Sequence, residues 1–200
     1  MQSMMVVIEG LDIVGKSTIA RGISEKGGWQ YYRTPPTAYY EECVKLGSDG
    51  YPVYTEERFW LFMECLKYSS QEILKLLNDG VSVAVDRWLW TTLSYHFAFN
   101  PELELKWQKV AVKEALDLVP PHLSILVHVA DEAEYQKRKA GRKTLTAHDK
   151  MVVNDKKRSS VILRNFKRLN PNFVLIDNSG DFNSTMDVVW KHIGAAQTMN

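Results

Sequence analysis

The sequence predicts an α/β fold of three layers, in which helices cover both faces of a five-stranded parallel sheet. Five short apolar runs alternate with longer segments whose apolar residues recur at helical spacing. Strands buried on both faces form continuous apolar runs of this kind, and strands that alternate with helices build parallel sheets. The predicted strands are residues 4–8, 29–33, 81–85, 123–129 and 173–177.

Turn and capping residues place the helices between these strands. The first helix begins near Ser17 and stops at Gly27-Gly28, because glycine commonly ends helices. Thr55 is a typical N-cap for a long helix that ends before Gly80. Further helices are predicted over residues 39–46, 88–99, 102–118, 149–168 and 184–196, and from residue 131 onward.

Length and charge limit the classes of function. Two hundred residues, 45% of them apolar, suit one domain that spans residues 1–200. The 25 basic and 24 acidic residues nearly cancel, so no field of one sign points to nucleic acid or a membrane surface as a partner. Neither is expected.

The two cysteines, Cys43 and Cys65, lack the spacing of a metal site, and a small secreted protein would normally carry more. Both are expected to be buried or partly buried thiols in a reducing compartment. The N-terminal segment has no basic region followed by an apolar stretch and a cleavage site, and no apolar run reaches membrane-spanning length. A cytoplasmic location is the default expectation.

Residues 9–18 form a motif for nucleotide binding. They fit the pattern G-x-x-x-x-G-K-[ST] of the phosphate-binding P-loop, between the first strand and the first helix. Glycines let backbone N–H groups converge on phosphate oxygens, the lysine supplies a cation, and the hydroxyl can bind Mg²⁺. An ordinary strand–helix turn is the alternative. The motif predicts a nucleoside triphosphate site made of Gly10, Val14, Gly15, Lys16, Ser17 and Thr18.

A second set of charged residues is predicted at the carboxyl ends of the strands, where ligands bind in such sheets. Arg33 follows the second strand, Asp86 and Arg87 follow the third, and a basic stretch with Arg138 and Arg142 follows the fourth. Phosphoryl transfer between two anionic substrates needs cations on both and a mobile cationic lid. The set therefore indicates a phosphotransferase. A structural ion pair of Asp86 with Arg87 and a solvated basic helix end are the alternatives.

These motifs resemble those of the thymidylate kinase family of nucleoside monophosphate kinases, almost from end to end. The family's Glu-Gly-x-Asp-x-x-Gly-Lys-Ser-Thr loop is similar to residues 9–18, and its Arg-Glu-Pro segment to residues 33–35. Its Asp-Arg-Tyr segment and the following Ala-Tyr-Gln resemble residues 86–88 and 94–96, and its lid resembles residues 138–149. Mitochondrial UMP-CMP kinase, from the same wider family, is also similar. The resemblance implies a P-loop NTPase fold with an arginine-bearing lid.

The resemblance also implies a role for each matching residue. Lys16 and Ser17 would hold the phosphates and Mg²⁺ of ATP, and Asp86 would lie near the metal. The acceptor's 5′-phosphate would lie between Arg33 and Arg87. The sugar and base of the acceptor would lie against Asp12, Phe62, Tyr95 and His96.

The chain departs from the family pattern beside the predicted phosphates. Many family members carry Arg directly after the loop Asp, and this chain has Ile13 there. The catalytic arginine would therefore come from the lid, with Arg142 as the first choice and Arg138 as the second.

The residues expected to contact the acceptor base depart further from the family pattern. His96 stands where the family has Gln, and the arginine usually found four residues past the stacking Phe falls on Leu66, with Lys67 beside it. Core packing is the alternative for Phe62, and a structural histidine is the alternative for His96. The identity of the base is therefore left open.

Together these observations predict an ATP-dependent, Mg²⁺-dependent nucleoside monophosphate kinase. Its acceptor would be a pyrimidine (deoxy)nucleoside 5′-monophosphate, with dTMP as the first choice. One alternative is a kinase of the same fold that acts on a nucleoside or another small phosphorylated metabolite. Another is a nucleotide-binding regulator without turnover. A GTPase switch is excluded, because the Asn-Lys-x-Asp and Asp-x-x-Gly motifs are missing.

The family commonly forms dimers through helices beside the P-loop helix. The apolar face of the long helix that carries Phe59, Phe62, Met63 and Leu66 is a candidate contact in a possible homodimer, and burial of that face in the core is the alternative.

Overall fold

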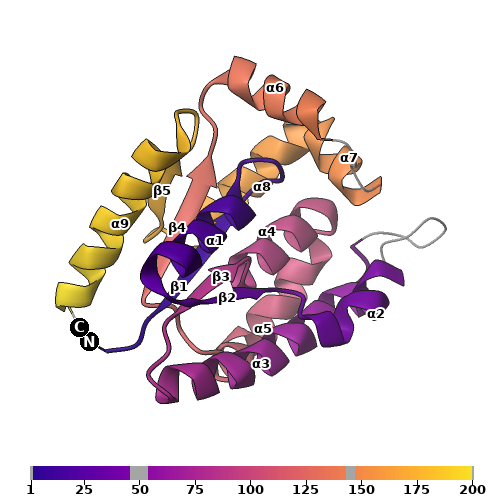
Figure 1. Cartoon of the computed structure of the whole chain (residues 1–200). Helices are drawn as coiled ribbons and strands as arrows, with labels where there is room; N and C mark the ends of the chain where they lie inside the picture. Colours follow the sequence, from indigo (N-terminus) through magenta and orange to yellow (C-terminus); the bar gives the residue numbers. More distant parts are fainter. Residues whose placement is uncertain (1, 46–53, 143–146, 200) are drawn as a thin grey trace.

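The computed structural model describes residues 2–45, 54–142 and 147–199, and it confirms the predicted three-layer fold. One parallel sheet runs in the order β2-β3-β1-β4-β5 (Figure 1). Each predicted strand is present. The strands are β1 Met5–Gly10, β2 Gln30–Arg33, β3 Val83–Asp86, β4 Leu123–His128 and β5 Val174–Asp177.

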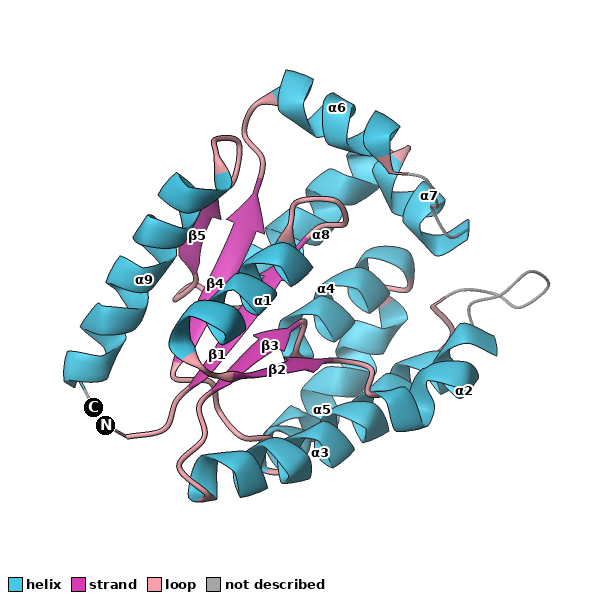
Figure 2. Ribbon diagram, in the orientation of Figure 1, coloured by secondary structure: helices cyan, strands magenta, loops and turns pink. Residues whose placement is uncertain are grey.

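Helices cover both faces of this sheet (Figure 2). The capping residues named above hold their positions: Thr55 accepts a hydrogen bond from the backbone N–H of Arg58, and Gly28 ends the first helix with φ 64°. The helices are α1 Lys16–Gly27, a 3₁₀ turn Thr37–Tyr39, α2 Tyr40–Lys45, α3 Glu56–Asn78, α4 Leu89–Phe99, α5 Glu102–Leu116, α6 Glu132–Gly141, α7 Ala147–Val153, α8 Lys156–Leu169 and α9 Phe182–Met199.

One helix prediction is wrong. Residues 149–168 do not form a single helix, because the chain turns at Asn154 and Asp155 between α7 and α8. The Asp155 side chain accepts a hydrogen bond from the backbone N–H of Arg158 and so begins a new helix. The apolar periodicity alone predicted one continuous helix, and it did not take account of Asp155 as a helix-capping residue.

Two apolar clusters hold the layers together. Alternate residues of β1 point to opposite faces: Val6 and Ile8 pack into one cluster with α1 and α9, and Met5 and Val7 pack into the other with α3 and α4. All four β1 side chains are fully buried. The strand before the P-loop is thus the central and most enclosed part of the sheet, which fixes the loop at one edge.

The expected dimer face lies inside the molecule. Phe59, Met63 and Leu66 are at most 1% exposed and belong to the second cluster, so they are unavailable to a partner. The interface prediction for this face is wrong, because periodicity does not show which side of a helix meets solvent. Among the described residues, no helix combines the length and apolar composition needed to cross a membrane.

Candidate active site

The P-loop takes the backbone shape that the motif predicts. Gly10 has φ 143°, and a Cβ atom there would lie 2.4 Å from the carbonyl oxygen of Val127 on β4. Gly15 has φ 96° and precedes α1 without any side-chain cap. The first N–H groups of α1 are therefore left to an anion, which the positive end of the helix dipole also favours.

Lys16 is the buried cation of this loop. Its ammonium group donates to the carbonyl oxygen of Leu11 and lies 4.0 Å from the Asp12 carboxylate. Burial, followed by repulsion from the nearby Arg87 charge, lowers the pKa of Lys16 to about 8. A phosphate group beside it would restore the charged form.

Ser17 joins the loop to the next strand of the sheet. Its hydroxyl donates to Asp86 Oδ2 across 2.5 Å, and the Tyr31 hydroxyl donates to the same oxygen across 3.1 Å. The other oxygen, Asp86 Oδ1, is buried without a hydrogen-bond partner among the described residues. A hydroxyl and an unsatisfied carboxylate oxygen form a hard donor set, which fits Mg²⁺.

The number of acidic ligands also fits. Among the described residues, no three His, Cys, Asp or Glu side chains gather as they would around a metal held by protein alone. Mg²⁺ in phosphoryl-transfer sites is bound by one or two protein groups together with phosphate and water.

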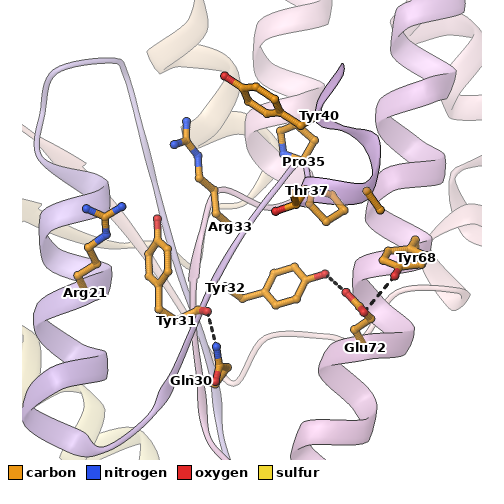
Figure 3. A pocket seen from close by; sticks show the side chains of 12 residues that line it. Arg21, Gln30, Tyr31, Tyr32, Arg33, Pro35, Thr37, Tyr40, Tyr68 and Glu72 are labelled. Atoms are coloured by element: carbon orange, nitrogen blue, oxygen red, sulfur yellow. Dashed lines mark hydrogen bonds between the residues drawn. The ribbon is translucent and has the colours of Figure 1, made fainter. Parts of the chain in front are cut away.

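Arg33 lies at the end of β2, directly beside Asp86 in the sheet register. Its Nε is 4.0 Å from Asp86 Oδ2, and its side chain is 55% exposed. It borders a hollow of about 580 Å³ against the outer edge of β2 (Figure 3). Tyr32, on the opposite face of the strand, donates to Glu72 instead. The Arg33 side chain is therefore an exposed cation at the edge of the loop.

Arg87 is the partly buried counterpart of Arg33, with a side chain that is 19% exposed. It follows β3 with φ 72°, a left-handed conformation that is costly for a residue with a side chain. Its guanidinium pairs with Asp12 of the P-loop, and the Tyr95 hydroxyl donates to the other Asp12 oxygen across 3.2 Å. Burial lowers the pKa of Arg87, but Asp12, Tyr95 and Asp86 together outweigh burial and hold the pKa above its usual value. The alternative interpretation, a structural ion pair of Arg87 with Asp86, is not what the structure has, because Arg87 pairs with Asp12.

The lid arginines take different positions. Arg138 reaches the P-loop, where it donates to the carbonyl oxygen of Val14 across 3.3 Å and to that of Asn178 across 2.5 Å. Arg142 lies 3.5 Å from the Asp149 carboxylate at the far end of α6. Residues 143–146 of the predicted lid lie outside the described residues. In the described part, Arg138 is the lid arginine that contacts the loop.

Sequence comparison identifies relatives of one kind. The chain is 28% identical to a probable thymidylate kinase of Thermoplasma acidophilum over 141 residues, which cover 67% of this chain and 69% of the relative. It is 28% identical to those of Archaeoglobus fulgidus, over 70% of this chain and 71% of the relative, and of Pyrococcus abyssi, over 78% and 80%. No protein-family model matches the sequence. These relatives, all named as probable thymidylate kinases, support a likeness to the thymidylate kinase family.

The fold agrees with this likeness. The solved thymidylate kinase of Candida albicans superimposes with a TM-score of 0.77 and 17% identity, covering all of this chain and 94% of the other. Members of the thymidylate kinase family are nucleotide kinases, and the arrangement of loop, carboxylate and arginines suits that chemistry.

The thymidylate kinase pattern predicts the base contacts on α3 and α4. Phe62 is only partly buried, and its ring lies edge-on to the His96 ring at 5.7 Å. His96 is buried, and its Nδ1 lies 2.8 Å from the carbonyl oxygen of Thr92, so Nδ1 carries the proton. Tyr54 and Phe59 also contact the imidazole. The Phe62 and His96 rings are thus in contact, and their role at the base stays a prediction.

The position where the family usually carries the second arginine faces elsewhere. Leu66 is 1% exposed in the core, and the ammonium of its neighbour Lys67 is 3.0 Å from Glu64 on α3 and from Glu114 on α5. Trp88, which replaces the usual Tyr, is also a core residue with 1% exposure.

Sequence reasoning missed two residues of the site. Glu9 is fully buried and accepts hydrogen bonds from the backbone of Trp88 and from both donors of Thr91, which ties the P-loop to the start of α4. Burial raises the pKa of Glu9 to about 7 against these hydrogen bonds. Asn178 follows β5 and donates to Val14 across 2.8 Å. Asn178 directly follows the last predicted strand, and the rule that ligands bind at strand ends could have identified it from the sequence.

Proposed function

We propose that this protein is an ATP-dependent nucleoside monophosphate kinase. It transfers the γ-phosphoryl group of Mg-ATP to the 5′-phosphate of a pyrimidine (deoxy)nucleoside monophosphate, with dTMP as the first candidate, and releases ADP and the diphosphate. The observation that carries the proposal is the contact of Ser17 with Asp86, because it joins the triphosphate loop to the strand end that presents Arg33 and Arg87.

The donor half of the site consists of the P-loop and the lid. The N–H groups between Gly10 and Ser17 and the ammonium of Lys16 bind the outer phosphates of ATP. Ser17 and Asp86 hold Mg²⁺, which when bound neutralises charge on the phosphates. Arg138 adds a cation beside Val14, and Arg142 follows when the lid closes.

The acceptor half uses charges from two strands. Arg33 and Arg87 bind the 5′-phosphate, because a guanidinium can hydrogen-bond two phosphate oxygens at once. Asp12 accepts from the sugar 3′-hydroxyl and Tyr95 lies against the sugar, while Phe62 and His96 contact the base. Catalysis then consists of positioning and charge stabilisation, and no protein nucleophile is needed.

A panel of acceptors tests this function. ADP release is followed by a coupled assay with each nucleoside and each nucleoside monophosphate at fixed Mg-ATP. We expect turnover with pyrimidine monophosphates, highest with dTMP, and none with the matching nucleosides. Turnover of nucleosides instead would favour the rival kinase, and no ADP above background with any acceptor would favour a regulator.

A further inference from the structure

Two free thiols meet between α2 and α3. The Sγ atoms of Cys43 and Cys65 lie 3.7 Å apart and share a hydrogen bond, although 22 positions separate the two residues in the sequence. Cys43 is 4% exposed and Cys65 is 1% exposed, which confirms the predicted burial of both cysteines. The two thiols belong to the surface along which the short helix α2 packs on the long helix α3 (Figure 1). A bond between these sulfurs would therefore join two separate elements of the fold.

The distance between the thiols is short enough for a disulfide. Because a disulfide bond is about 2.05 Å long, the two sulfurs have to approach each other by less than about 2 Å. A metal ion is another common reason for neighbouring cysteines. Among the described residues, however, no three His, Cys, Asp or Glu side chains gather as metal ligands would. Oxidation to a disulfide is therefore the chemistry that fits this pair.

A buried cation favours the reactive form of one thiol. Arg58 is 7% exposed and lies two turns before Cys65 on α3, and no carboxylate in the described part of the chain forms a salt bridge with it. The hydrogen bond from Cys65, followed by the charge of Arg58, lowers the pKa of Cys43, while burial and the Glu42 carboxylate act against them. The same hydrogen bond, together with burial, raises the pKa of Cys65. Because the thiolate is the nucleophile, Cys43 is the thiol that attacks first.

We propose that Cys43 and Cys65 are a modification site, at which a low-molecular-weight disulfide such as oxidised glutathione forms a reversible cross-link between α2 and α3. The Cys43 thiolate attacks one sulfur of the oxidant and releases a glutathione thiolate. Cys65 gives its proton to this thiolate and attacks the Cys43 sulfur of the mixed disulfide. The second glutathione leaves and takes up the proton that Cys43 had lost to water. Two protein thiols are thus oxidised, and one oxidised glutathione is reduced to two thiols.

The bond should be easily reversed, and it should stabilise the fold while it lasts. A cation that stabilises the Cys43 thiolate also stabilises the reduced form, so the disulfide is easier to reduce than a structural one. Disulfides of this labile kind are typical of redox-sensing proteins in reducing compartments. The cross-link restricts 22 positions of the unfolded chain, which raises the free energy of unfolding.

The test uses the full chain with its natural residues. The reduced protein is incubated without oxygen in glutathione buffers of increasing oxidised fraction, and peptide mapping without reductant follows both cysteines. We expect the two thiols to disappear together, to appear as one link within a single chain, and to return with dithiothreitol. The oxidised protein should melt about 5 to 10 °C above the reduced protein. Thiols that stay free or only carry glutathione, links between two chains, or an unchanged Tm after the link has formed would overturn the proposal.

Single substitutions distinguish the two thiols. Cys65→Ala removes the thiol that resolves the mixed disulfide, so Cys43 should keep one glutathione. Cys43→Ala leaves only the buried Cys65, which should stay unmodified. Stable glutathione on Cys65 but not on Cys43 would refute Cys43 as the nucleophile.

The role of Arg58 is tested on the trapped adduct. Adding Arg58→Met to Cys65→Ala should slow the attachment of glutathione several-fold at pH 7, because a smaller fraction of Cys43 is ionised. Adding Lys67→Met is the matched control, since it removes a cation of the same helix that pairs with Glu64 and Glu114. Equal rates in the two double variants would remove Arg58 from the modification site.

These readouts do not depend on the proposed function. Thiol counts, peptide masses and melting temperatures are all measured without substrate. A protein that forms the link but phosphorylates no monophosphate would leave this inference standing and overturn the kinase proposal alone. A kinase that never forms the link would do the reverse.

Discussion

The hydroxyl of Ser17 donates to the carboxylate of Asp86 across 2.5 Å, although 69 positions separate the two residues in the sequence. Parallel pairing of β1 with β3 places Ile8 opposite Asp86, so the end of β3 lies beside the start of the loop. Asp86 also receives the Tyr31 hydroxyl and lies near Arg33. One carboxylate thus connects the groups proposed for the donor, the metal and the acceptor.

Removing the charge of Asp86 should weaken metal binding. Asp86→Asn keeps the shape of the side chain but offers one neutral oxygen in place of an anion. We expect the Mg²⁺ concentration for half-maximal rate to rise at least about tenfold, as when a metal site loses a supporting group. A Mg²⁺ titration of initial rates measures this, and Asp79→Asn at the exposed end of α3 is the control. An unchanged titration would remove Asp86 from the metal site.

Lys16 should make ATP binding depend on pH. Its pKa of about 8 in the free protein means that the ammonium loses its proton as pH rises through 8, and the neutral amine does not attract phosphate. The Kd for ATP should be flat below this pH and rise up to about tenfold per unit above it. Calorimetric titrations from pH 6.5 to 9.5 measure the trend.

Lys16→Ala provides the control for that profile, because it removes the titrating group. We expect it to lose turnover by about 10²- to 10³-fold, the usual effect of deleting one transition-state charge contact. Circular dichroism should show an intact fold. Wild-type turnover in this variant would contradict the whole assignment.

The two lid arginines can be ranked by paired substitutions. Arg138 contacts the loop carbonyl of Val14, whereas Arg142 is held by Asp149. Arg138→Ala should therefore lower kcat/KM for ATP by about 100-fold, and Arg142→Ala by a smaller factor. Initial rates over a range of ATP concentrations decide the order. A larger loss at Arg142 would show that closure of the lid exchanges the two.

Glu9 should shape the pH dependence of stability. Because its folded pKa is about 7 and the ordinary value is 4.5, the folded protein holds a proton that the unfolded chain releases over this interval. Wild-type stability should therefore fall as pH rises from about 5 to 7, relative to Glu9→Gln, by roughly 2 kcal/mol. Urea unfolding at pH 5, 6 and 7 compares them. Parallel curves for the two proteins would refute the raised pKa.

Local patterns predicted much of this molecule. Apolar runs and caps located the strands and most helices, because those signals lie within a few residues. The strand-end rule predicted that Asp86 and Arg33 would meet, and they do. The same rule did not show that Arg87 would turn back to Asp12, since this depends on a left-handed backbone at Arg87 that sequence does not reveal.

Side-chain direction was the part that sequence could not supply. Phe59 and Phe62 lie on the same helix and share the same periodic pattern, yet one is fully buried and the other is only partly buried.

The backbone at Ile13 has a conformation that arginine can also adopt. It has φ 64°, a conformation that costs a β-branched residue about 1–2 kcal/mol, and it occupies the position where many family members carry arginine. An unbranched side chain takes this backbone shape more easily than isoleucine does. The step from isoleucine to arginine therefore asks nothing new of the main chain. Ile13→Arg would thus add a cation to the P-loop on a backbone that isoleucine already adopts.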